Sequence, residues 1–278
     1  MIIILSTAAM AMPVTAPGAD VLIIMDESGS MAGEQAWVSG SGGMLDLLDQ
    51  SLIAAGVTNN RYGVVGFGYG SYGSEVPFKH ELNGSDWGVA ADVAANLNPS
   101  FQTHGLYEDG FWALGFALNN YTFRPDAALN IILITDEDRD NRSSYIYASV
   151  LTMLEEHNAI LNVIVNNPFG QALGTDGEYS YIGDGIGGYL SSLGFTIGNG
   201  EGNTENTYVP MALATGGAAW NLNYLRAGGV TAESFTNAFV DIKVAEIERQ
   251  QTPEPGTLAL MGLGILGLLT IMFVRTKM

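Results

Sequence analysis

Four short apolar runs constrain the fold of this chain more than any other feature. They are DVLIIMD (20–26), YGVVGFG (62–68), LNIILITD (129–136) and AILNVIV (159–165). Each run is rich in β-branched residues and is apolar at successive positions, so both faces of the strand it forms must be covered. Strands of this kind lie between two layers of helices, and the runs therefore predict a mostly parallel sheet.

The segments between these strands have helical patterns, which we place at 44–55, 87–97, 109–121, 143–158 and 231–250. Alternating strands and helices predict a doubly wound α/β domain over about 19–250, with helices on both faces of the sheet. Residues 167–208 break the alternation and are rich in Gly, Asn and Tyr, so we expect an insertion there. Its aromatic residues either contact a partner or pack onto their own domain: Phe169, Tyr179, Tyr181, Tyr189 and Phe195.

Composition excludes several classes of function. The net charge is −19, with only ten Lys and Arg residues, so no basic stripe exists for nucleic acid. The same acidity favours divalent cations and cationic partners. The chain contains no Cys, which excludes disulfides, zinc thiolate sites and Cys nucleophiles.

The two ends of the chain differ from the domain between them. Residues 1–16 are apolar and then small, as in a secretory signal peptide, although the usual positive start is missing and a lead into the first strand is the alternative. Residues 252–278 contain Pro253, Glu254 and Pro255, then 18 uncharged residues at 257–274, then Arg275 and Lys277. An 18-residue helix is about 27 Å long, which suits one transmembrane helix.

This order of motif, apolar segment and basic end resembles a PEP-CTERM sorting signal. The resemblance implies recognition and cleavage by an exosortase, and at least transient contact with the inner membrane. It implies an exported protein of the cell envelope, surface or extracellular matrix. A plain membrane anchor is the alternative interpretation of the same segment.

Polar residues directly follow the first predicted strand. Asp26, Ser28 and Ser30 form a D-x-S-x-S pattern at its carboxyl end, the edge at which parallel α/β sheets bind ligands. Here the chain resembles a von Willebrand factor type A (vWA) domain, in which this pattern begins a metal-ion-dependent adhesion site. The resemblance implies a ligand role for Thr103 in SFQTHG and for Asp136 in ILITDED. Two departures are His104 after Thr103, and Glu137 where the family usually has Gly.

The ligand types suggest how such a site works. Magnesium prefers six oxygen ligands, and Mn²⁺ or Ca²⁺ are alternatives. Ser28, Ser30 and Thr103 offer neutral hydroxyls, so the ion stays electron-poor and attracts a carboxylate from a partner protein or surface ligand. We therefore predict an exported adhesion protein that is not an enzyme.

Other interpretations remain open at this stage. A matrix protein whose vWA fold uses no metal is one alternative. A hydrolase is another, with His80, His104 and His157 as the possible bases, although no G-x-S-x-G elbow is present. The acidic run DEDRD (136–140) is either a second cation site or a solvated loop.

Overall fold

The computed structural model describes residues 18–71, 73–97, 104–167, 169–171, 178–179, 181–182, 194–196 and 203–251. The predicted signal peptide (1–16), Thr103, the Pro253, Glu254, Pro255 motif and the predicted transmembrane helix (257–274) lie outside these residues. Within the described part of the chain, no helix combines the length and the apolar character needed to cross a bilayer.

The domain is built on a seven-stranded sheet with the order β3-β2-β1-β4-β5-β10-β8. Its five inner strands are mutually parallel: β1 (Ala19–Asp26), β2 (Arg61–Phe67), β4 (Ala128–Thr135), β5 (Ile160–Val165) and β10 (Ala219–Asn221). The edge strands β3 (Phe78–Lys79) and β8 (Tyr181–Ile182) are antiparallel to their neighbours. The expectation of a mostly parallel sheet is confirmed.

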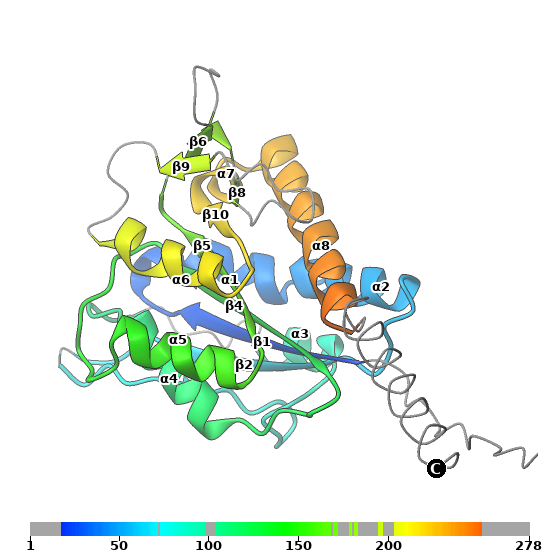
Figure 1. Cartoon of the computed structure of the whole chain (residues 1–278), viewed down its shortest axis with the longest axis horizontal. Helices are drawn as coiled ribbons and strands as arrows, with labels where there is room; N and C mark the ends of the chain where they lie inside the picture. Colours follow the sequence, from blue (N-terminus) through cyan, green and yellow to red (C-terminus); the bar gives the residue numbers. More distant parts are fainter. Residues whose placement is uncertain are drawn as a thin grey trace, which may run out of the picture.

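Helices cover both faces of this sheet (Figure 1). One face packs on α1 (Ala32–Ser39), α2 (Met44–Ala54), α3 (Ala90–Leu97), α7 (Leu222–Arg226) and α8 (Gly229–Gln251). The other packs on α4 (Gly110–Asn120), α5 (Tyr147–Glu156) and α6 (Tyr208–Ala214). Along β1, Val21 and Ile23 join the first core while Leu22 and Ile24 join the second. This alternation is the physical basis of the doubly wound fold.

The insertion forms a small sheet of its own. Strand β6 (Phe169–Gln171) pairs with β7 (Glu178–Tyr179) and with β9 (Gly194–Thr196), both antiparallel. Phe169 is fully buried in the core beneath α6, so this residue packs onto its own domain and offers no contact surface. The side chains of the other four aromatic residues named above lie outside the described part.

A buried polar network ties α8 to the sheet. The Oε2 atom of Glu246 accepts hydrogen bonds from Lys243 Nζ (2.6 Å), Asn130 Nδ2 (2.9 Å) and Asn162 Nδ2 (2.8 Å). Lys243 is fully buried, and Glu246 nearly so. The two asparagines come from β4 and β5, within runs that are otherwise apolar, so each polar strand position has a partner on the covering helix.

The chain order of the sheet reverses between β1 and β4. From β1 the chain continues to β2 on one side, whereas β4 lies on the other side. Loops leaving the carboxyl ends of two such strands turn in opposite directions and leave a crevice between them, which is where open α/β sheets bind ligands. Asp26 ends β1, and Asp136 directly follows β4.

Candidate metal site at the carboxyl edge of the sheet

Asp26 is the most deeply buried residue of the predicted site, with no solvent-exposed surface. Its Oδ1 accepts a hydrogen bond from the backbone N–H of Ser28 (2.8 Å), and its Oδ2 accepts one from the hydroxyl of Thr135 (2.7 Å). Both donors are neutral. Burial raises the pKa of Asp26 to about 7, although these hydrogen bonds favour the ionised form. A cation nearby would offset the cost of burying this charge.

The two serines lie side by side and reach the end of β4. The hydroxyl oxygens of Ser28 and Ser30 are 3.0 Å apart, and Ser30 donates a hydrogen bond of 2.9 Å to Oδ1 of Asp136. Ser28 and Asp136 are almost completely buried, while Ser30 is exposed. The structure thus brings together four of the five predicted ligands; the fifth, Thr103, lies outside the described residues.

The loops beside Asp26 are held by backbone contacts. His104, the residue after Thr103, donates its backbone N–H to the carbonyl of Glu27 (3.1 Å), and its own carbonyl accepts from Gly70 (2.9 Å). Gly68 has a φ of +74°, and a Cβ there would lie 2.8 Å from Oδ1 of Asp26. Only glycine fits this close approach without displacing the buried carboxylate.

A hollow of about 320 Å³ opens beside the serines. Its lining includes both hydroxyl-bearing residues of the D-x-S-x-S loop together with several acids and small residues: Ser28, Gly29, Ser30, Gly105, Leu106, Glu108, Glu137 and Asp140. Burial raises the pKa of Glu108 to about 9, and the charges of Asp26 and Asp140 add to this effect. Carboxyl groups crowded around one hollow favour a bound cation, because it relieves their mutual repulsion.

Arg226 is a residue of this site that the sequence did not indicate. It stands at the end of α7, and its Nη2 donates to Oδ2 of Asp136 (2.8 Å) while its Nε donates to Oε1 of Glu34 on α1 (2.7 Å). The same Nη2 lies 3.2 Å from the carbonyl oxygen of Ser30. No motif or spacing marks Arg226, since α7 is only five residues long and follows a Gly-rich segment.

The donor set fits a divalent cation of the hard, oxygen-preferring type. Two neighbouring hydroxyls, two carboxylates and an adjoining hollow are present, and three of the described residues that line the hollow are acids: Glu108, Glu137 and Asp140. Among the described residues, no three His, Asp or Glu side chains are arranged to bind a metal by themselves. The hydroxyls of Ser28 and Ser30 are further oxygen atoms that this edge offers to a cation.

The acidic run 136–140 is held by contacts with other segments, although Glu137 within it is exposed. Asp138 accepts a hydrogen bond from the backbone N–H of Asn203 (3.2 Å), and Asp140 accepts one from that of Glu108 (2.6 Å). Arg139 is buried and pairs with Asp109 at 2.7 Å. These contacts fix the run as one wall of the hollow.

The three histidines have structural surroundings. His80 lies against the fully buried Glu27 and the ring of Phe78. His157 follows α5 and stacks edge-on against Phe123. His104 is exposed and is held by the backbone contacts described above.

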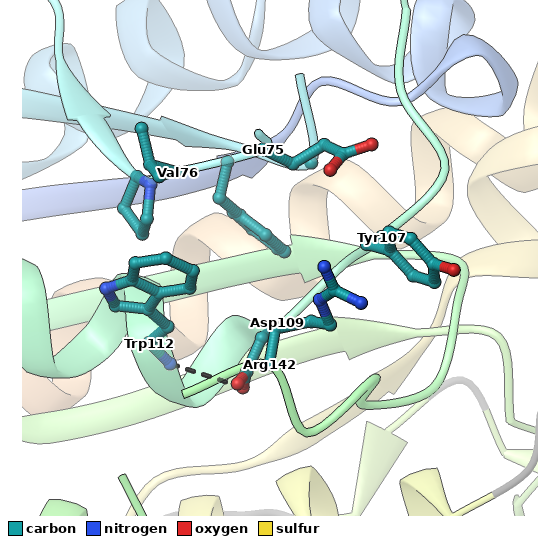
Figure 2. A pocket seen from close by; sticks show the side chains of 9 residues that line it. Glu75, Val76, Tyr107, Asp109, Trp112 and Arg142 are labelled. Carbon is teal, nitrogen blue, oxygen red and sulfur yellow. Dashed lines mark hydrogen bonds between the residues drawn. The ribbon is translucent and has the colours of Figure 1, made fainter. Parts of the chain in front are cut away.

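A second, much smaller crevice is lined in part by Phe67 and Gly68; it is drawn in Figure 2. Figure 2 shows Glu75, Trp112 and Tyr107 around it, with the guanidinium of Arg142 4.1 Å from the centre of the Tyr107 ring. Oε2 of Glu75 accepts from Gly73 N (2.7 Å), while its buried Oε1 has no partner among the described residues. The free space is about 10 Å³, which is room for one water molecule. The larger hollow is therefore the candidate ligand site.

Comparison with protein families identifies the end of the chain. Residues 251–275 match the PEP-CTERM protein-sorting motif. This match confirms the sorting signal predicted from Pro253, Glu254 and Pro255, and it implies exosortase-mediated sorting and export to the cell envelope. No curated protein sequence matches this chain.

Solved structures with similar folds include two that cover most of this chain. Proximal thread matrix protein 1 from the mussel byssus, with a zinc-occupied MIDAS motif, is 13% identical, with a TM-score of 0.47 over 80% of this chain and 46% of that one. An aerotolerance-related membrane protein from Bacteroides fragilis NCTC 9343, carrying multiple mutations to serines, is 16% identical, with a TM-score of 0.42 over 81% and 99% of the two chains. This chain thus spans less than half the length of the mussel protein.

Proposed function

We propose that this chain is an exported binding protein that holds one divalent cation at the carboxyl edge of its sheet and uses it to bind a carboxylate of a partner. The ligands are Asp26, Ser28, Ser30, Thr103 and Asp136, and Mg²⁺ is the cation of choice, with Mn²⁺ and Ca²⁺ as substitutes. Binding, and not hydrolysis or another reaction, is the proposed activity. The proposed place of action is the cell surface or the extracellular matrix, which the PEP-CTERM motif supports because it implies export to the cell envelope.

One observation carries the proposal. The hydrogen bonds from Ser28 through Ser30 to Asp136 join the ends of β1 and β4 into one row of oxygen atoms beside the hollow. When bound there, a divalent cation supplies an open coordination position for a carboxylate. The serines orient the row, Asp26 supplies buried negative charge behind it, and the walls of the hollow limit what can approach.

Calorimetric titration of the full chain with Mg²⁺ and Mn²⁺ tests this function. We expect binding at one site per chain and its loss in Asp26→Asn, which keeps the side-chain shape but removes the charge. Asp46→Asn is the matched control. Asp46 lies on α2, outside the site, and its carboxylate accepts an exposed hydrogen bond from the backbone N–H of Gly42 (2.8 Å). Absence of divalent-cation binding by the unmodified chain would exclude the proposal.

A matrix protein that uses no metal is the second candidate, and one contact favours it. Arg226 already gives Asp136 a positive partner at 2.8 Å, as a protein-derived substitute for a cation would. Asp26, however, receives only neutral donors. The same titration distinguishes the two candidates.

A further inference from the structure

Arg226 constrains Asp136 more tightly than a surface ion pair would. Asp136 is 7% exposed, and both of its carboxylate oxygens are engaged: Oδ1 by Ser30 and Oδ2 by Arg226. The guanidinium is itself anchored at Nε by Glu34, which is 5% exposed. A planar group held at two edges by two buried carboxylates has little freedom to turn away.

This arrangement determines how Asp136 can take part in metal binding. Each oxygen of Asp136 already accepts one hydrogen bond, so only its remaining lone pairs are open to a cation or to water bound to one. The guanidinium of Arg226 lies next to Asp136 and to the carbonyl oxygen of Ser30, so its positive charge acts on any ion that binds beside these two residues.

From this geometry we propose that Arg226 is a positioning residue that holds Asp136 and tunes the site for its partner: its charge lowers the affinity for the cation and raises the affinity for the partner's carboxylate. The inference rests on the proposed metal-dependent function and deepens it. A fixed positive charge repels an incoming cation and attracts an incoming anion, so one residue has opposite effects on the two binding steps.

The test is whether replacing Arg226 changes the affinity for the cation and the affinity for the carboxylate in opposite directions. In Arg226→Gln we expect Mn²⁺ to bind roughly tenfold more tightly, and acetate to bind the Mn²⁺-loaded protein roughly tenfold more weakly, since a unit charge held a few ångströms away in a partly buried site changes affinities by this order. If Arg226 merely supported the loop, its replacement would weaken both Mn²⁺ binding and acetate binding.

The experiment uses the full chain in detergent. Mn²⁺ affinity is measured by calorimetry, and acetate affinity by the fall in water-proton relaxation as acetate displaces water from bound Mn²⁺. Arg249→Gln is the matched control, because it removes the same charge from the last turn of α8, where its Nη2 donates to the carbonyl of Gly216 (3.3 Å). This control corrects for the change in net charge.

Removing Arg226 alone leaves Glu34 buried without its cation, which threatens folding. The double variant Glu34→Gln/Arg226→Gln avoids this, since it deletes the pair together, and opposite shifts of smaller size are expected in it because the negative charge of Glu34 is lost as well. Opposite shifts in either folded variant support the inference. Parallel shifts, or unchanged affinities with the unmodified chain still binding Mn²⁺, overturn the inference alone. Failure of the unmodified chain to bind Mn²⁺ overturns the proposed function as well.

Discussion

Ser30 donates a hydrogen bond of 2.9 Å to Oδ1 of Asp136, across 106 positions of sequence. The bond joins the loop after β1 to the end of β4, the two neighbouring strands between which the chain order reverses. It therefore places a hydroxyl and a carboxylate side by side at the carboxyl edge of the sheet, where open α/β sheets bind ligands.

Ser30→Ala should weaken Mn²⁺ binding by about tenfold, because it removes a hydroxyl ligand and frees Oδ1 of Asp136. Ser30 is exposed, so the free energy of unfolding should change by less than about 1 kcal/mol. Calorimetry and urea unfolding measure the two quantities. Ser74→Ala is the control, since that exposed hydroxyl bonds only a carbonyl of its own loop and its loss should leave Mn²⁺ affinity unchanged. Equal effects of the two variants would remove Ser30 from the site.

Asp109→Asn should lower the free energy of unfolding by about 3 kcal/mol, because it leaves the buried Arg139 without its counter-charge. Asp109 also caps α4 and accepts two hydrogen bonds from Ser143. The matched control is Asp86→Asn, whose half-exposed pair with Lys79 should contribute less than about 1 kcal/mol. Urea unfolding at pH 7 compares the two.

The structure also predicts how the destabilisation caused by Asp109→Asn depends on pH. Burial opposes the charge on Asp109, but its hydrogen bonds and Arg139 together hold the pKa of this carboxyl below the ordinary value of 3.8. A lowered folded-state pKa gives stability that is present above pH 3.8 and is lost as the pH falls through the folded value. The difference between the unmodified chain and Asp109→Asn should shrink on acidification. A difference that grows in acid would contradict this assignment.

Lys243→Met should destabilise the domain by about 3 kcal/mol at pH 7, because Glu246 is then a buried carboxylate without its cation. The double variant Lys243→Met/Glu246→Gln should recover much of this loss, since it removes both charges. Burial lowers the pKa of Lys243 to about 8, against an ordinary value of 10.5. Between these two pH values the unfolded chain binds up to one more proton than the folded chain. The free energy of unfolding of the unmodified chain should therefore rise with pH, relative to that of Lys243→Met. Urea unfolding from pH 7.5 to 10 measures the trend, and a flat difference would refute it.

Export should end in cleavage near the sorting motif. Mass spectrometry of the envelope-located protein should find a C-terminus at about 253–256, since Pro253, Glu254 and Pro255 lie within the PEP-CTERM match at 251–275. Glu254→Gln should leave the chain uncleaved, whereas Glu248→Gln, on α8, should be processed normally. Recovery of intact Met278 in the surface-located protein would favour a plain membrane anchor.

Much of this molecule could be predicted from local sequence. Runs such as LNIILITD carry apolar residues on both faces of the strand, which predicts a sheet covered on both faces. The polar residues after the first run, Asp26, Ser28 and Ser30, then must lie at the carboxyl edge, because the strand ends there. The sorting motif could likewise be predicted from the sequence, because its parts follow one another directly along the chain.

Tertiary structure alone decided the rest. Phe169 is buried because β6 runs directly from the sheet into the insertion. Arg226 meets Glu34 across 192 positions and Asp136 across 90. Such contacts have no periodic or local signature, because they depend on which helix the fold sets against which strand end, and that choice is made by the whole core.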